Sequence, residues 1–567
     1  MKKFQTLKLA AAITAGFTLV GCGALDEDDD NKSSSSTGLT KSFNCTDVTT
    51  AGERVICIGS ADDLSDSAVQ KELIDALADA QSGDTYVFPQ GRYNLSTTIN
   101  FEGASLSSND VDGLTFRGAG IDKTIFDVSG SSADGFLINN TDDLLFEDFG
   151  VYESNNNAIK VTKSDGVVMR RVATVWETDY LATNGAYGLY PVETSNVLIE
   201  DCFVQGSADA GVYVGQSSNI VVRNNQAVKN VAGIEIENST NADVYGNTAI
   251  GNTGGILVFD LPIGNGKYGS GVRVFDNIVE DNNAPNFANI GSNPGGVHIV
   301  PPGTGIIVLS TSDVEIYNNT IKNHQTLAVA ITSFLLPDDS VADAPKTSDV
   351  TKVSDIHPYA EILLDGWSPF VRNINIFNNT ISNDADSNDP QGSLIKDIVN
   401  GYHTYQIMTG QTADNGKAYM PHILYDGIGE LLVNTVHPDP SVGGLTMLQA
   451  IAGGINQVAA AFDAANPAMM NNFTQYSNED RVCEYNNGEN TTSAAVYPRE
   501  TDAAYSDFNS ETMAPKTNVE QFKATTMNDD SMTCTGITKT PLAAATVTIG
   551  DTTYGCGVDD TTSTFCK

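Results

Sequence analysis

One short pattern recurs through much of the chain and limits what it can fold into. Nine segments align on a pair of apolar residues two positions apart, at spacings of 30, 23, 30, 23, 22, 30, 42 and 60 residues. A second apolar pair precedes five successive units by eight residues. Residues two apart point to one side of a strand, so each pair marks a strand with one buried face. The nine pairs are Leu114/Phe116, Leu144/Phe146, Val167/Met169, Val197/Ile199, Ile220/Val222, Ala242/Val244, Val272/Val274, Val314/Ile316 and Ile374/Ile376.

A repeat of about 22 residues with strand periodicity and small turns predicts a parallel β-solenoid. A leucine-rich repeat has a similar length, but its leucine framework and helical half are missing here. An asparagine holds one position in five successive coils, as a stacked amide ladder inside a turn requires. These are Asn225, Asn247, Asn277, Asn319 and Asn379, and Cys202 takes the same position one coil earlier, which predicts a packed free thiol.

The residue after each inward pair points outward and forms two runs. The first five alternate in charge, which predicts a stabilising ladder of ion pairs: Arg117, Glu147, Arg170, Glu200 and Arg223. The next four form an aromatic stripe, Tyr245, Phe275, Tyr317 and Phe377. Two interpretations stay open, a platform that holds a sugar chain and a seam buried beneath the neighbouring insertions.

Three later coils are longer between their two strands, which places insertions at one corner, over 259–271, 300–313 and 332–373. The second insertion follows from taking Val297/Ile299 as the inward pair, which points His298 outward in line with Glu235. Loop growth on one side of a scaffold is typical of binding sites. The candidate residues near this corner are Trp367 beside the stripe for binding and His298, Asp260, His357 and Asp365 for catalysis. Their carboxylates are suitable Ca²⁺ ligands, although neither an EF-hand nor a nonapeptide calcium repeat is present.

The two ends of the chain carry other signals. Lys2, Lys3 and Lys8 precede an apolar run that ends at Gly21-Cys22, which resembles a bacterial lipobox with Cys22 as the acylated residue. A plain secretory signal is the alternative. Gly23 after the cysteine favours the outer membrane by the same resemblance. The expected organisation is a signal peptide over 1–21, an acidic and serine-rich tether over 22–40, an N-terminal cap with an amphipathic helix over 41–100, the solenoid over 101–384, an aromatic and helical extension over 385–482 and a cysteine-containing tail over 483–567.

Cysteine usage and charge agree with export. Cys45 and Cys57 are close enough to form one disulfide, and Cys483, Cys534, Cys556 and Cys566 are expected to pair among themselves in one of three ways. Acidic residues number 71 against 30 basic ones, a net charge of −41. A chain of this charge repels phosphate backbones, which excludes nucleic acid as an expected partner.

Several segments resemble a family of secreted or lipid-anchored proteins with right-handed parallel β-helix repeats of the pectate-lyase-like and carbohydrate-binding-and-hydrolysis types. The segments are the cap motif AQSGDTYVFPQGRY, Gly254 to Pro262, Asn282 to Ala288, Pro301 to Ile321 and Arg481 to Gly488. The resemblance is strongest to an uncharacterised lipoprotein subfamily, which implies a right-handed all-β helix but no particular chemistry. Its members tend to be encoded beside a second exported protein.

Two functions are therefore open. The first is a lipid-anchored binding or scaffold module for a polysaccharide or a companion exported protein. The second is a polysaccharide lyase or epimerase on an anionic glycan, for which a base and a charge-neutralising cation are needed. The polygalacturonase motifs, the paired arginines of pectate lyases and the Asp-Pro-His-Asp motif of mannuronan epimerases are absent. These absences favour the binding hypothesis.

Overall fold

The fold is known from a computed structural model. It describes residues 39–43, 45–46, 48–50, 53–103, 110–288, 296–342, 345–346, 348–382, 421–434, 449, 452–453, 455–457, 476–488, 491–495, 530–560 and 566. Cys22 and most of the tether and of the extension lie outside these residues. Among the described residues, no helix combines the length and the apolar character needed to cross a membrane.

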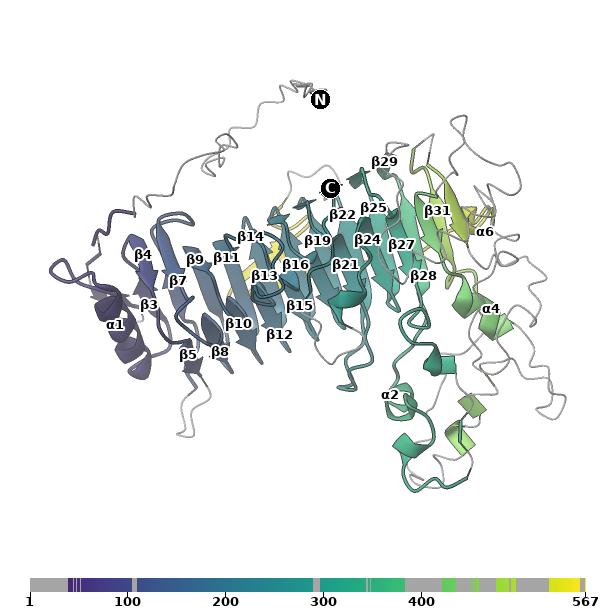
Figure 1. Cartoon of the computed structure of the whole chain (residues 1–567), viewed down its shortest axis with the longest axis horizontal. Coiled ribbons are helices and arrows are strands. Elements are labelled where there is room, and N and C mark those ends of the chain that lie inside the picture. Colours follow the sequence, from purple (N-terminus) through teal and green to yellow (C-terminus); the bar gives the residue numbers. More distant parts are fainter. Residues whose placement is uncertain are drawn as a thin grey trace, which may run out of the picture. The chain divides into compact units, whose positions relative to one another are not determined.

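The described chain from residue 39 is built of coils that place parallel strands in two sheets (Figure 1). The eleven-stranded sheet receives one strand from each coil. In coil order its strands are β5 (Ile99–Glu102), β8 (Phe136–Asn139), β10 (Ile159–Thr162), β12 (Leu189–Val192), β15 (Ala210–Gly215), β18 (Ala232–Glu237), β21 (Gly254–Phe259), β24 (Thr304–Leu309), β27 (Leu327–Thr332), β30 (Ile423–Tyr425) and β32 (Ser493–Ala495).

The 21-stranded sheet receives two strands from most coils, and the strand called longer here is the first of the two along the chain, which from β13 onward has more residues than the second. The longer ones are β1 (Val48–Thr50), β2 (Glu53–Cys57), β3 (Asp84–Val87), β6 (Thr115–Arg117), β9 (Leu144–Tyr152), β11 (Asp165–Val175), β13 (Ser195–Glu200), β16 (Ser218–Arg223), β19 (Thr240–Tyr245), β22 (Ser270–Phe275), β25 (Ser312–Tyr317), β28 (Arg372–Phe377) and β31 (Val482–Tyr485). The shorter ones are β4 (Gly91–Asn94), β7 (Thr124–Asp127), β14 (Phe203–Gln205), β17 (Gln226–Val228), β20 (Thr248–Ile250), β23 (Ile278–Glu280), β26 (Thr320–Lys322) and β29 (Thr380–Ser382).

The sheet register confirms the nine-unit alignment. Ile220 pairs with Ala242 and Val222 with Val244, and the same step repeats from coil to coil. All nine predicted inward pairs are buried in one continuous core. The sheets extend past the expected limits of 101–384, because β3 and β4 precede them and β30, β31 and β32 follow them.

The amide ladder is confirmed and is longer than predicted. The Asn225 side-chain NH2 donates to Asn247 Oδ1 at 2.9 Å, and the chain of bonds continues through Asn379 to Asn487. Cys202 is buried and free, and its N–H donates to Asn225 Oδ1 at 2.9 Å. Because each amide also binds backbone of the preceding coil, the ladder satisfies turn groups that the strands leave unpaired.

Helices and a hairpin lie outside the coils. The predicted N-terminal helix is α1 (Asp66–Ala78), which buries Val69, Leu73 and Leu77 against the first coils. The other helices are α2 (Ala360–Leu364), α4 (Ile428–Asn434) and α6 (Asp530–Thr533), with 3-10 turns η1 (Val297–Ile299), η2 (Asp339–Ala342) and η3 (Val353–Asp355). The hairpin is β33 (Thr546–Ile549) and β34 (Thr552–Gly555).

The predicted cysteine partition is confirmed. Cys45 bonds Cys57, and the four late cysteines pair as Cys483–Cys534 and Cys556–Cys566. The first late bond joins the coil of β31 to α6, and the second closes the loop after β34. The tail is therefore tied to itself and to the last coil.

Candidate active site

The aromatic stripe forms a stacked ladder with one more ring than the sequence indicated. Tyr245, Phe275, Tyr317, Phe377 and Tyr485, named here the aromatic ladder, have successive ring centroids 4.8, 4.9, 5.0 and 5.2 Å apart. The planes of neighbouring rings differ by 10° or less. Each inner ring therefore uses both faces on its neighbours and has none to offer a sugar.

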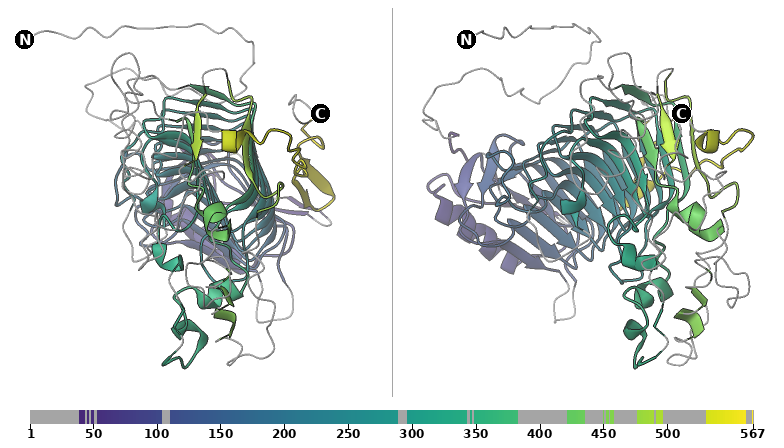
Figure 2. Two further views of the ribbon diagram at one scale, coloured as in Figure 1. Left: turned by 90° about the vertical axis from the view of Figure 1, so that its right-hand side faces the viewer. Right: turned by 45° about the vertical axis from the view of Figure 1, so that its right-hand side comes forward.

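The C-terminal tail, rather than the insertions, covers most of this ladder. Tyr245, Phe275 and Tyr317 are 2%, 0% and 8% exposed, and they share a buried cluster with Val547 of β33. Figure 2 shows the yellow hairpin on the outer side of the sheet, where β33 packs on β13 and β16. The first rings are thus a seam, and the cover is the tail rather than the insertions.

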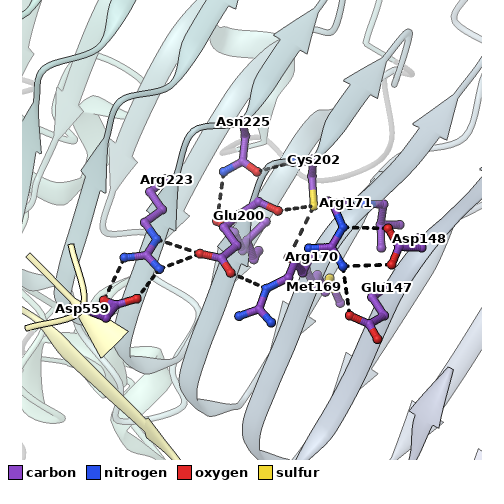
Figure 3. Close-up of polar contacts among 12 residues, drawn as sticks. Glu147, Asp148, Met169, Arg170, Arg171, Glu200, Cys202, Arg223, Asn225 and Asp559 are labelled. Atoms are coloured by element: carbon purple, nitrogen blue, oxygen red, sulfur yellow. Dashed lines mark hydrogen bonds and ion pairs between the residues drawn. The ribbon is translucent and has the colours of Figure 1, made fainter. Parts of the chain in front are cut away.

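The charged run forms ion pairs in two groups, Arg117–Glu147 and Arg170–Glu200–Arg223. Arg171, rather than Arg170, is the second partner of Glu147, and the run also holds the tail in place (Figure 3). Arg223 pairs with Glu200 at 2.6 Å and with Asp559, just after the hairpin, at 2.6 Å. Arg223 also donates to the Tyr245 hydroxyl at 3.2 Å. The charge ladder and the aromatic ladder therefore meet under one cover.

The insertions cover a different surface, the outer face of the eleven-stranded sheet. Trp367 is buried in an apolar cluster with Phe259 and Phe334, and its indole N–H donates to the Asp260 carbonyl at 3.1 Å. Trp367 therefore packs the cover and does not lie beside the aromatic ladder. The first and third insertions begin where the sequence placed them, after β21 and after β27.

The second insertion lies earlier in the chain than predicted. The predicted outward position of His298 on a strand is therefore also wrong. The inward pair of that coil is Ile306/Val308 in β24, whose register partners are Ile256 and Val258. His298 lies in the 3-10 turn η1, half-buried, in an insertion between β23 and β24. The two candidate pairs have the same apolar spacing after a glycine, so only the hydrogen bonds to the neighbouring coil separate them.

The other predicted catalytic residues do not converge on one site. His357 is buried, and its Nδ1 accepts from the Tyr359 N–H at 3.1 Å. Asp365 is exposed and accepts from the Tyr268 hydroxyl at 2.7 Å. Asp260 is buried, and burial first, then the charge of Glu237, raises the pKa of its carboxyl well above the usual value. Among His298, His357, Asp365 and Asp260, only Asp260 is thus linked to Glu237, which belongs to a cluster of carboxyl and tyrosine side chains.

A group of carboxyl and tyrosine side chains occupies the outer face of the eleven-stranded sheet where β12, β15 and β18 lie side by side. Tyr213 is the register partner of Glu235, and Glu237 lies two residues further on the same face. The three tyrosine rings are in mutual contact, with centroids 4.3 to 4.9 Å apart. The carboxyl–tyrosine cluster consists of Asp209, Glu235, Glu237, Tyr187, Tyr190 and Tyr213.

Glu237 is held by two donors. The Tyr213 hydroxyl donates to Glu237 Oε1 at 2.9 Å, and the Gln216 NH2 donates to the same oxygen at 3.2 Å. Tyr213 can reach along the strand because its neighbour on that face is Gly215. A Cβ at position 215 would lie 2.3 Å from the Tyr213 hydroxyl oxygen. The hydrogen bond between Tyr213 and Glu237 therefore requires glycine at position 215.

Burial gives the three carboxyl groups unusual acidities. Burial raises the pKa of Glu237 to about 7, while the donors Tyr213 and Gln216 lower it. Burial and the charge of Glu237 raise the pKa values of Glu235 and Asp209 further above the usual range. Such carboxyls that share a desolvated space lose protons in separate steps. Ionisation of one carboxyl therefore makes the other two harder to ionise.

One oxygen of the cluster lacks a hydrogen bond. Glu235 is 1% exposed, and no described group donates to its Oε2. Tyr187, Tyr190 and Asp209 are only half-buried, so the cluster has an open side. Lys160 lies 5.0 Å above the Tyr190 ring at that side. Within the described part of the chain, no group of three metal-ligating side chains has the geometry to hold a metal ion.

The sequence contained a signal for this cluster, although no catalytic motif marks it. The strand AGIEIE of β18 alternates apolar and acidic residues, which places Glu235 and Glu237 on the outer face beside Tyr213. Outward acids are normally solvated, so the pattern alone does not distinguish them from an ordinary surface. Their burial depends on the tyrosines and on neighbouring covers.

Comparison with known proteins places the fold. Residues 134–392 match the family described as a right handed beta helix region. This part of the chain is a right-handed parallel β-helix. The confirmed strand register and the predicted family resemblance therefore agree. A comparison with curated proteins gives no match.

Solved structures with a similar course of the chain include two proteins with named activities. The A-module of the mannuronan C-5 epimerase AlgE4 from Azotobacter vinelandii is 18% identical, with a TM-score of 0.34, over 59% of this β-helix chain and 87% of that one. A polygalacturonase from Erwinia carotovora ssp. carotovora is 12% identical, with a TM-score of 0.36, over 61% and 97%.

Proposed function

We propose that this β-helix protein is an enzyme that hydrolyses a polysaccharide at the carboxyl–tyrosine cluster. The observation that carries the proposal is the set of three carboxyl groups in one desolvated space with separated acidities. Hydrolysis of a glycosidic bond needs a protonated acid and an ionised base, which such a set provides at one pH. The half-buried tyrosines supply ring surface at the open side for a sugar.

The roles follow from the hydrogen bonds. Glu237 accepts from Tyr213 and Gln216, so it is the carboxyl most easily ionised and serves as the base that takes a proton from water. Asp209, half-buried at the open side, retains its proton and donates it to the leaving sugar oxygen as the C–O bond breaks. The water oxygen bonds to the anomeric carbon, so the reaction consumes one water. Afterwards Glu237 loses its new proton to solvent and Asp209 takes one up, which restores both groups.

The cluster favours a neutral polysaccharide over the anionic glycan expected for a lyase or epimerase. Lys267 donates to the Gln216 carbonyl at 2.8 Å, and Lys160 lies over Tyr190. Proton abstraction from a uronate needs a cation that neutralises its carboxylate, and these two lysines already contact Gln216 and Tyr190. The aromatic stripe offers no open platform for a sugar chain on its inner rings, because these rings are covered.

The test compares one isosteric variant with a matched control. Glu237→Gln preserves an oxygen that accepts from Tyr213, so the fold should persist while the base is lost. We expect hydrolysis to fall roughly 100-fold or more. Glu361→Gln, an exposed position on α2, should retain full activity. Purified protein is incubated with xylan, starch, alginate and polygalacturonate, and reducing ends and unsaturated ends are measured separately.

Each outcome decides the proposal. New reducing ends from xylan or starch that disappear in Glu237→Gln support it. Unsaturated ends from alginate or polygalacturonate would show a lyase instead. Reducing ends that are equal in Glu237→Gln and the parent would place the chemistry elsewhere, and no product from any substrate would reject hydrolysis of these polymers.

We also propose that the enzyme is exported and anchored to the outer membrane through acylated Cys22. The lipobox-like leader and the three disulfides support this location. The full-length chain expressed in a bacterium should incorporate labelled palmitate and sediment with membranes. Cys22→Ser should abolish the label, and retention of the label in that variant would contradict the proposal.

A further inference from the structure

A cavity lies on the other sheet, away from the carboxyl–tyrosine cluster. Its volume is about 410 Å³, and it lies, partly open to solvent, between the outer face of the 21-stranded sheet and tail residues 533–542. Tyr317, Asn375, Phe377 and Tyr485 line the side formed by the sheet. Small-molecule sites in proteins commonly have volumes of roughly 300 to 1,000 Å³. The space is therefore sufficient for a small ligand.

One polar group in the cavity wall has an unused acceptor. Asn375 is 5% exposed, and no described group donates to its Oδ1. Most buried polar atoms in proteins have a partner, because leaving one unpaired costs free energy. The Oδ1 atom is itself covered, so a hydroxyl group in the cavity would supply the missing donor once the Asn375 amide turns toward it.

The charged groups around the cavity already have partners. Arg273 binds Asp243, with 2.7 Å between Nε and Oδ1. Lys539 donates to Asn373 Oδ1 at 3.0 Å and to two backbone carbonyls. Glu315 accepts from the Leu542 N–H at 3.3 Å. Because these charges are compensated, the cavity does not select an anion or a cation.

The aromatic ladder ends at this cavity. Tyr485 is the last ring of the ladder and is 42% exposed, in contrast to the covered inner rings. Exposed aromatic surface beside a hydroxyl acceptor suits a sugar ring, which has apolar C–H faces and hydroxyl edges. The disulfide Cys483–Cys534 joins the sheet to the tail at the cavity, so its two walls are fixed before a ligand binds.

We infer that this cavity is a second carbohydrate site, which binds one neutral sugar residue without reacting with it. Asn375 accepts a hydrogen bond from a sugar hydroxyl, and Tyr485 contacts the ring. The inference rests on the proposed function only for the class of ligand, a polysaccharide. The site would retain the polymer on the protein while the other sheet carries out hydrolysis.

The test measures binding without turnover. Full-length protein is mixed in turn with methyl β-glucoside, methyl β-galactoside and methyl β-N-acetylglucosaminide, and saturation-transfer NMR gives the affinity for each. At least one glycoside should bind the parent. Asn375→Ala and Tyr485→Ala should each weaken it about ten-fold. Gln226→Ala, an exposed amide on β17, should bind like the parent.

The outcomes separate this inference from the proposed enzyme. Absence of binding to all three glycosides, or equal binding by parent and both cavity variants, overturns the inference. Tyr485→Ala keeps the test decisive if Asn375→Ala fails to fold, because the Tyr485 ring is largely at the surface. Glu237→Gln should bind the glycosides normally while losing hydrolysis. Binding without any hydrolysis would reject only the proposed function, and hydrolysis without binding would reject only this site.

Discussion

Replacing Tyr245 with alanine should destabilise the protein strongly and leave sugar binding unchanged. The ring is 2% exposed and lies between the sheet and the C-terminal tail. Removing a large buried aromatic side chain typically costs about 3 to 5 kcal/mol of unfolding free energy. The variant also loses one stacked partner, Phe275, and the hydrogen bond from Arg223. We therefore expect a loss near the upper end, about 4 to 5 kcal/mol.

Two further variants assign this loss to its causes. Tyr245→Phe retains the ring and removes only the hydroxyl, so it should cost about 1 kcal/mol. Tyr485→Ala removes a ring at the exposed end of the same ladder and should also cost about 1 kcal/mol. Urea unfolding monitored by circular dichroism gives the three values, provided that the denaturant slope stays the same.

Part of the loss will appear as detachment of the hairpin rather than as global unfolding. Amide hydrogen exchange in β33 and β34 measures that part, because a released hairpin exchanges faster than the coils. A loss below about 1 kcal/mol for Tyr245→Ala, together with unprotected hairpin amides in the parent, would refute the buried seam. Loss of glycoside binding without loss of stability would restore the open platform.

Four other predictions follow from the same contacts. Between about pH 4.5 and about pH 7, stability should fall as pH rises, because Glu237 is protonated in the folded state and ionised in the unfolded state; urea titrations of Glu237→Gln should show a shallower fall. Asn277→Ala removes bonds to Asn247, Asn319 and the Val244 carbonyl, and calorimetry should show a loss of about 3 kcal/mol or more. Asp559→Asn should make the hairpin more sensitive to limited proteolysis with the coils intact, and unchanged digestion would contradict its anchoring role. Gly215→Ala should displace Tyr213 from Glu237, which shifts the acidic limb of the activity profile to higher pH, whereas an unmoved limb would contradict the assigned base.

The sequence predicted those features that depend on residues at repeating positions. The inward pairs, the amide ladder and the charge ladder all follow from one register, because parallel coils place equivalent residues on top of one another. The cysteine partition followed from proximity along the chain. The incorrect placement of His298 has the same origin. Val297/Ile299 and Ile306/Val308 both fit the apolar pattern of this strand, and the local sequence does not distinguish them.

The covers could not be predicted because they depend on segments far apart in sequence. Asp559 is 336 residues from Arg223, and no periodicity connects them. The row of Tyr245, Phe275 and Tyr317 was visible, but its burial depends on that distant hairpin. A repeat thus determines which side chains face outward. It does not determine which of them meet solvent.

The candidate catalytic residues also depend on which outward-facing side chains are covered and which meet solvent. Glu235 and Glu237 would be ordinary surface acids on a bare sheet, with ionised carboxylates and little influence on each other through water. The rings of Tyr187, Tyr190 and Tyr213 and the nearby insertions exclude that water, and Gly215 lets Tyr213 bind Glu237 and favour its ionisation over that of its neighbours. The separation of acidities is therefore a property of the cover and of one glycine. A variant that opens the cover should lose the acid and the base together, even with every carboxyl in place.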